Sequence, residues 1–166
     1  MRKTTLRTER LALVPQTLEQ ARAFVDGQVG DLPLAPGYPH ADSLDGLRMW
    51  VENGGPDDGG WFVTLADDGR VVGDCGTHGP PDADGRLEIG YGLAAPFRGR
   101  GLGLEMVRAM ADWLAAQEDV QVLTASVEVG NEPSRRLLER LGFRLDGEAD
   151  GHWQYVREGS PTTISA

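Results

Sequence analysis

Pro96-Phe-Arg-Gly-Arg-Gly-Leu-Gly103 joins a predicted strand to a predicted helix and carries glycine at three alternate positions. Because glycine has no Cβ and adopts conformations closed to other residues, successive N–H groups can converge there on one anion. The start of the following helix adds partial positive charge, and Arg98 and Arg100 add two full charges. We expect the loop to bind a diphosphate. A glycine turn that serves only tight packing is the alternative.

The spacing of the glycines separates this loop from two other phosphate loops. A Walker loop requires Gly-Lys followed by Ser or Thr, and residues 96–103 include no lysine. The dinucleotide fingerprint requires glycine at relative positions one, three and six. Counted from Gly99, the sixth position is Leu104. The remaining pattern is Arg98-x-x-Gly101-x-Gly103, placed between a strand and a helix.

Apolar residues on both sides of the loop recur with the periods of strands and helices. Before the loop, strands are predicted at Leu11–Val14, Trp61–Ala66, Val71–His78 and Arg86–Leu93, and helices at Thr17–Val25 and Ser43–Val51, with Ser43 as N-cap. After it, helices at 101–117 and Glu132–Leu141 alternate with strands at Val120–Val127, Phe143–Leu145 and Trp153–Val156. This order predicts an α/β (α+β) mixed sheet with helices on both faces.

The length of 166 residues suits one domain, which we place at residues 1–158, with 159–166 as a flexible tail. Without a secretory signal or a long apolar run, a cytoplasmic protein that does not associate with membranes is expected. The net charge of −10 repels phosphates, so nucleic-acid binding is not expected. One cysteine, Cys75, excludes an internal disulfide, and no residue grouping has metal-ligand spacing, so no metal is expected.

The loop pattern resembles the acetyl-CoA pyrophosphate loop of the GNAT acetyltransferase family. Three further segments are similar to the RimJ/RimL-like branch, the ribosomal-protein-alanine acetyltransferases: Leu6–Leu13, Glu88–Leu93 and Asn131–Phe143. The order of predicted elements also agrees with that family over roughly residues 5 to 157. The resemblance therefore implies the GNAT fold and acetyl-CoA as co-substrate.

In that fold, a mostly antiparallel sheet splays between its fourth and fifth strands, here Arg86–Leu93 and Val120–Val127. The resemblance places the pantetheine arm of acetyl-CoA in the opening, hydrogen-bonded to backbone near Gly92 and Leu93. The residues implied to bind acetyl-CoA are Gly92, Leu93, Arg98, Gly99, Arg100, Gly101, Leu102, Gly103, Asn131 and Ser134. The implied reaction is acetyl transfer to a primary amine, of a protein N-terminus or a small molecule, by direct attack in a ternary complex. A homodimer is compatible with the family.

Two residues are candidates for proton transfer. In similar proteins the Asn of Asn131-x-x-Ser134 contacts the coenzyme, and the Ser hydroxyl donates a proton to the leaving thiolate. The alternative is that Asn131 caps the helix and Ser134 bonds only local backbone. Glu88 lies on the strand face opposite its apolar residues, where it could take the amine proton through water or hold the ammonium. A solvated acidic residue is the alternative for Glu88.

A noncatalytic acyl-CoA-binding module is the alternative function, since it would keep the loop and lose the groups that handle protons. The joint presence of Glu88, Asn131 and Ser134 favours the enzyme.

The acceptor pocket is expected to form from Leu32–Pro39 and Asp150–Trp153, the segments that match the family least. His78 and His152 could line it, although lone histidines near turns are usually surface residues. The amine itself is not identified by the sequence.

Overall fold

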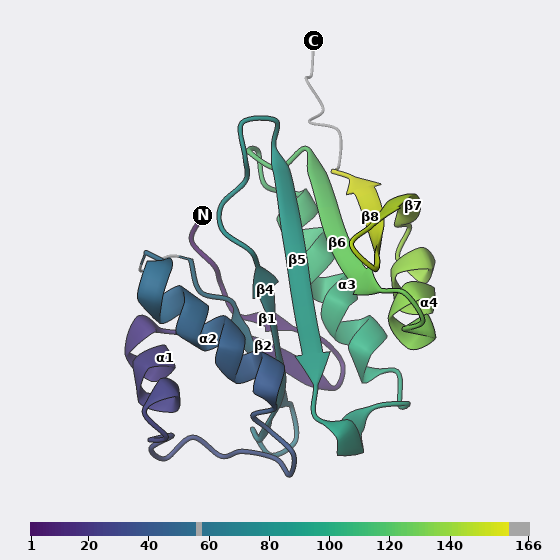
Figure 1. Cartoon of the computed structure of the whole chain (residues 1–166). Coiled ribbons are helices and arrows are strands. Elements are labelled where there is room, and N and C mark those ends of the chain that lie inside the picture. Colours follow the sequence, from purple (N-terminus) through teal and green to yellow (C-terminus); the bar gives the residue numbers. More distant parts are fainter. Residues whose placement is uncertain (56–57, 160–166) are drawn as a thin grey trace.

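The computed structural model describes residues 1–55 and 58–159 and places one eight-stranded sheet through the molecule, in the order β1-β2-β3-β4-β5-β6-β8-β7 (Figure 1). The strands are β1 Leu6–Arg7, β2 Leu11–Pro15, β3 Trp61–Leu65, β4 Val71–Thr77, β5 Arg86–Leu93, β6 Val122–Glu128, β7 Arg144–Ala149 and β8 His152–Glu158. Neighbouring strands are antiparallel except β5 and β6, which are parallel.

Helices cover both faces of this sheet, as the sequence predicts (Figure 1). They are α1 Leu18–Val25, α2 Ala41–Asn53, α3 Leu102–Ala115 and α4 Glu132–Arg140. In Figure 1, α1 and α2 lie together in front of the sheet, and α3 lies behind it. The inner side of α3 buries Met106, Met110 and Leu114 completely, which explains the helical spacing of these apolar residues.

The sheet splays between β5 and β6, as expected. The two strands pair only from Arg86 opposite Val122 to Glu88 opposite Thr124. Beyond Glu88, β5 continues alongside β4 and β6 continues alongside β8, and Figure 1 shows them diverging. The edge of β5 that faces β6 therefore has no ladder partner over residues 89–93.

The start of α2 corrects one prediction. Ser43 is not the N-cap. His40 has an extended backbone at that position, and its Nδ1 accepts a hydrogen bond from the Ser43 N–H at 3.2 Å. Ser43 lies in the first helical turn, so α2 begins at Ala41, two residues earlier than predicted. Histidine is seldom considered as a cap because Ser, Thr, Asp and Asn are the usual residues there.

Other boundaries differ at the ends of elements. The short strand β1 was not predicted, and β7 extends to Ala149, beyond the predicted end at Leu145. Gly159, the first residue of the predicted tail, donates its N–H to the Gln121 carbonyl at 2.7 Å, and the rest of that tail lies outside the described residues. Within residues 1–55 and 58–159, no helix is both long enough and apolar enough to cross a membrane.

Candidate active site

The loop after β5 presents its backbone N–H groups outward. Gly99 and Gly101 have φ of +76° and +79°, in the left-handed region that favours glycine, and Gly101 is the N-cap of α3. The N–H groups of residues 99–103 donate to no acceptor among the described residues. Five successive amides at the positive end of a 14-residue helix can therefore bind an anion.

The side chains of this loop mostly support its shape. Arg98 Nε donates to the Leu93 carbonyl at 3.0 Å, which fastens the loop to the end of β5. The Arg100 guanidinium lies 5.6 Å from the centre of the Phe97 ring. Leu102 is buried, so it offers a ligand only its backbone.

Gly103 differs from the other two glycines of the loop. Its φ is not positive, and a Cβ there would lie 3.2 Å from Leu137 Cδ1 of α4. Close packing of α3 against α4 therefore accounts for this glycine, which is the alternative that the sequence left open for the whole loop.

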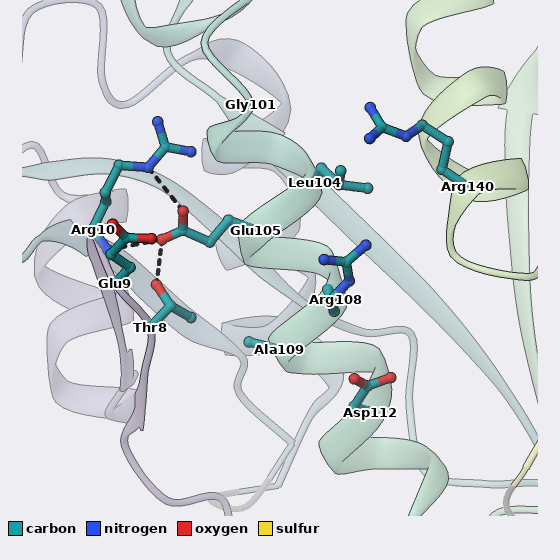
Figure 2. Close-up of a pocket in the computed structure, with 10 residues that line it drawn as sticks. All are labelled: Thr8, Glu9, Arg10, Gly101, Leu104, Glu105, Arg108, Ala109, Asp112 and Arg140. Carbon is teal, nitrogen blue, oxygen red and sulfur yellow. Dashed lines mark hydrogen bonds and ion pairs between the residues drawn. The ribbon is translucent and has the colours of Figure 1, made fainter.

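Arg10 holds the loop from its outer side (Figure 2). Its guanidinium donates to the Arg100 carbonyl at 2.9 Å and pairs with Glu105 at 2.8 Å. Thr8 Oγ1 and the Arg10 N–H also donate to the Glu105 carboxylate. Burial raises the pKa of Glu105, but these hydrogen bonds outweigh burial and lower it. No role was predicted for Thr8, Arg10 or Glu105. Thr8 and Arg10 nevertheless lie in Leu6–Leu13, one of the segments that resemble the family, and Glu105 follows the glycine loop.

Figure 2 shows a pocket of about 610 Å³ beside this support, lined by Arg10, Gly101, Glu105, Arg108 and Arg140 among others. Neither Glu88 nor Ser134 lines it. The pocket therefore does not include the residues predicted to handle protons.

Ser134 and Tyr91 meet on the α4 side of β5. Asn131 caps α4, with its Oδ1 accepting from the Ser134 N–H at 3.3 Å. The Ser134 hydroxyl lies 2.5 Å from the Tyr91 hydroxyl. Burial raises the pKa of Tyr91, and the bond to Ser134 acts in the opposite direction. Strand alternation puts Tyr91 with Leu87 and Ile89 on the face opposite Glu88, which the sequence predicted to be apolar. The hydroxyl group of Tyr91, on an otherwise apolar strand face, was the signal that could have indicated a polar role.

The opposite side of β5 carries Glu88, Gly90 and Gly92. Glu88 Oε2 lies 3.0 Å from His78 Nδ1, with the two side chains 36% and 64% exposed. A Cβ on Gly90 would lie 2.7 Å from His78 Nε2, and a Cβ on Gly92 would lie 2.7 Å from His40 Nε2. Two imidazole rings therefore occupy the space that side chains at positions 90 and 92 would fill.

A buried polar pair lies beside His40. The Tyr38 hydroxyl donates to Asp74 Oδ2 at 2.9 Å, and Asp74 stands opposite Gly92 in the sheet register. Burial raises the pKa of Asp74, although the hydroxyls of Ser43 and Tyr38 act to lower it. Tyr38 belongs to the segment Leu32–Pro39 that the sequence expected near the acceptor.

A metal centre and a nucleophilic cysteine are two other kinds of catalytic group, and the described residues support neither. Residues 1–55 and 58–159 contain no cluster of three or more His, Cys, Asp and Glu side chains able to hold a metal ion. Cys75 is fully enclosed, and burial raises the pKa of its thiol, which disfavours the nucleophilic thiolate.

Comparisons with known proteins agree with this geometry. The family model for the acetyltransferase (GNAT) domain matches residues 9–144. The N-acetyltransferase YjdG of Bacillus subtilis is 30% identical over 126 residues, which cover 72% of this chain and 75% of that protein. An acetyltransferase from Agrobacterium tumefaciens superposes with a TM-score of 0.63 at 26% identity, covering 95% of this chain and 96% of that one. Mycobacterium smegmatis RimJ, solved with a CoA disulfide, shares the fold with a TM-score of 0.62 at 22% identity, covering 93% and 86%. The eight-stranded sheet that opens beside a loop of unpaired amides is thus that of an acetyl-CoA-dependent N-acetyltransferase, and the chain belongs to the GNAT family.

Proposed function

We propose that this protein transfers the acetyl group of acetyl-CoA to a primary amine, on a protein N-terminus or a small molecule, by direct attack in a ternary complex. The observation that carries the proposal is the run of unpaired amides at residues 99–103, which follows the part of β5 that has separated from β6. A cytoplasmic location and a homodimer stay predictions from the sequence.

The coenzyme would lie along the open edge of β5. Its pyrophosphate would accept hydrogen bonds from the amides of Gly99, Arg100, Gly101, Leu102 and Gly103, with the N-terminus of α3 adding partial positive charge. Half of the backbone groups of residues 89–93 point toward β6, where they have no ladder partner. The pantetheine arm would take that partner's place.

The backbone at Gly92 and Leu93 would bind the end of the arm that carries the acetyl group. An N–H in this stretch would polarise the thioester carbonyl and stabilise the oxyanion that forms on attack. Arg98 would act mainly through the Leu93 carbonyl that it holds at 3.0 Å.

The leaving thiolate would receive its proton from Ser134. Tyr91 lies 2.5 Å from the Ser134 hydroxyl and keeps its own proton at neutral pH because burial raises its pKa. It can therefore donate to Ser134 as the Ser134 proton moves to sulfur. Asn131 holds the first turn of α4 in place through its cap.

Glu88 would handle the proton of the attacking amine, since it is the carboxylate on the other side of the same strand. An amine with an ordinary pKa near 10.4 is almost entirely protonated at pH 7, so removing this proton is part of the reaction. Because the site holds one group for the proton of the thiolate and another for the proton of the amine, we favour an enzyme over a noncatalytic acyl-CoA-binding module.

The experiment is free-thiol release from acetyl-CoA with a panel of peptides, amino acids, polyamines and aminoglycosides, with products identified by mass. We expect thiol release together with an acceptor that is 42 Da heavier. Tight binding of CoA without thiol release from any amine would favour the noncatalytic module.

A further inference from the structure

We propose that His78 and His40 form the acceptor side of the active site, with His78 Nε2 as the base that takes the amine proton and His40 Nε2–H as a donor to the thioester oxygen. The inference rests on the proposed function and refines its account of the amine proton: His78 takes this proton in place of Glu88, and His40 is added as a donor. Its evidence is the placement of both imidazoles over the glycines of β5.

The contact with Glu88 determines which ring nitrogen of the neutral His78 carries the proton. A carboxylate only accepts hydrogen bonds, so His78 Nδ1, at 3.0 Å from Glu88 Oε2, carries the proton. In the neutral ring, Nε2 is then unprotonated, and it lies over Gly90. A carboxylate that fixes the tautomer of a histidine and stabilises its protonated form is the arrangement of a catalytic acid–base pair. Glu88 is thereby a positioning residue.

His40 has the opposite tautomer. Its Nδ1 accepts from the Ser43 N–H, so in the neutral ring the proton lies on Nε2. That nitrogen lies over Gly92, beside the backbone that would polarise the thioester. The start of α2 holds the ring at this position, next to the end of β5 (Figure 1). His40 is thus a donor, where His78 is an acceptor.

The two rings share one face of β5. Gly90 and Gly92 are two residues apart, so their positions are separated by about 7 Å along the strand. The pair Tyr91 and Ser134 lies on the other face. The amine would therefore approach from the α2 side, and the leaving thiolate would be protonated from the α4 side.

The reaction balances with these groups. The ammonium first releases one proton to solvent. His78 Nε2 then takes a second proton as the amine nitrogen bonds to the carbonyl carbon, and His40 Nε2–H donates a hydrogen bond to the oxygen as negative charge develops. The carbon–sulfur bond then breaks, and the thiolate takes the Ser134 proton. Tyr91 reprotonates Ser134, and a proton from solvent restores Tyr91. The protonated His78 releases its proton to solvent. An ammonium and acetyl-CoA thus give an amide, CoA and one proton.

Charged and titratable groups near the rings come from β5, β4, the start of α2 and the segment before α2. Glu88 on β5 faces His78, and Asp74 on β4 is electrostatically coupled to His40. Asp42 at the start of α2 acts on the same Asp74, and Tyr38 is bonded to it.

The first test is the pH dependence of kcat in His78→Gln, with Asp68→Asn as the control. Asp68 forms an exposed pair with Arg70 at 2.8 Å across the β3–β4 turn, so its loss removes a comparable surface contact. We expect His78→Gln to lower kcat about 100-fold and to lose the break between the acid limb and the plateau. Glu88→Gln should lose less activity and keep the break. A His78→Gln enzyme that keeps the break overturns the assignment, and so does one within about 3-fold of wild type.

The second test is His40→Asn, because asparagine preserves the cap of α2 but lacks the imidazole. We expect kcat to fall about 100-fold with the break at an unchanged pH, and the thermal midpoint to stay near that of wild type. A kcat within about 3-fold of wild type contradicts the role of His40. Acetylation by the wild-type protein separates the two levels, since its absence refutes the proposed function itself.

Discussion

The two faces of β5 carry different kinds of proton-handling group. On the α4 face, Tyr91 and Ser134 form one short, partly buried hydrogen bond, and burial raises the pKa of Tyr91. On the α2 face, His78 and Glu88 form a pair that is well exposed. A partly buried pair of hydroxyl groups keeps its protons until they are donated, whereas an exposed imidazole can exchange protons with water. The difference suits one face to the leaving group and the other to the amine.

Among the variants that follow, the largest effect is expected from one on the α4 face. Ser134→Ala removes the hydroxyl that would protonate the thiolate, so kcat should fall about 100-fold. The KM for acetyl-CoA should change little, because the amides of the loop are untouched. Steady-state kinetics measure both quantities, and an unchanged kcat would remove Ser134 from the mechanism.

A smaller effect is expected on the α2 face from Gly90→Ala. The new Cβ would lie 2.7 Å from His78 Nε2 and would displace a flexible imidazole, so kcat should fall about 10-fold. Gly147→Ala is the matched control, because Gly147 also lies in a strand and a Cβ there has no neighbour within 4 Å. Equal kcat values for the two variants would show that the position of His78 does not matter.

The smallest effect concerns the support of the loop and appears in stability. Glu105 has a lowered pKa in the folded protein, so it stabilises the fold above the ordinary carboxyl pKa and loses this effect as pH falls through the lowered value. Glu105→Gln should lower the free energy of unfolding by about 1 kcal/mol near pH 7. Urea unfolding at several pH values measures this difference, and a difference that does not shrink in acid would contradict the assignment.

The fold could be predicted from the sequence because its signals are local. The apolar spacing of α3 and the left-handed glycines at 99 and 101 are properties of short segments. The N-cap of α2 was wrongly predicted as Ser43, because the true cap is His40 and a histidine cap has no common sequence pattern. The splay was expected only from the family resemblance, because no local sequence pattern shows where β5 leaves β6.

Much of the candidate site could not be predicted, since it depends on contacts between distant segments. Tyr91 and Ser134 are 43 residues apart in sequence. The ring of His40 reaches Gly92 only because α2 packs at the end of β5. The loop was identified from its own residues, but the residue that holds it, Arg10, lies 90 positions before Arg100 in the sequence.

Calorimetric titration of CoA into wild type, Gly99→Val and Gly69→Val tests most directly whether the amides of the loop grip the coenzyme. Gly99 and Gly69 have φ of +76° and +73°, and a Cβ on either would have no neighbour within 4 Å, so the two variants carry matched backbone strain. We predict that Gly69→Val binds CoA like wild type and that Gly99→Val binds at least about 10-fold more weakly, because the valine disturbs the amides. Equal affinities for the two variants would contradict the account.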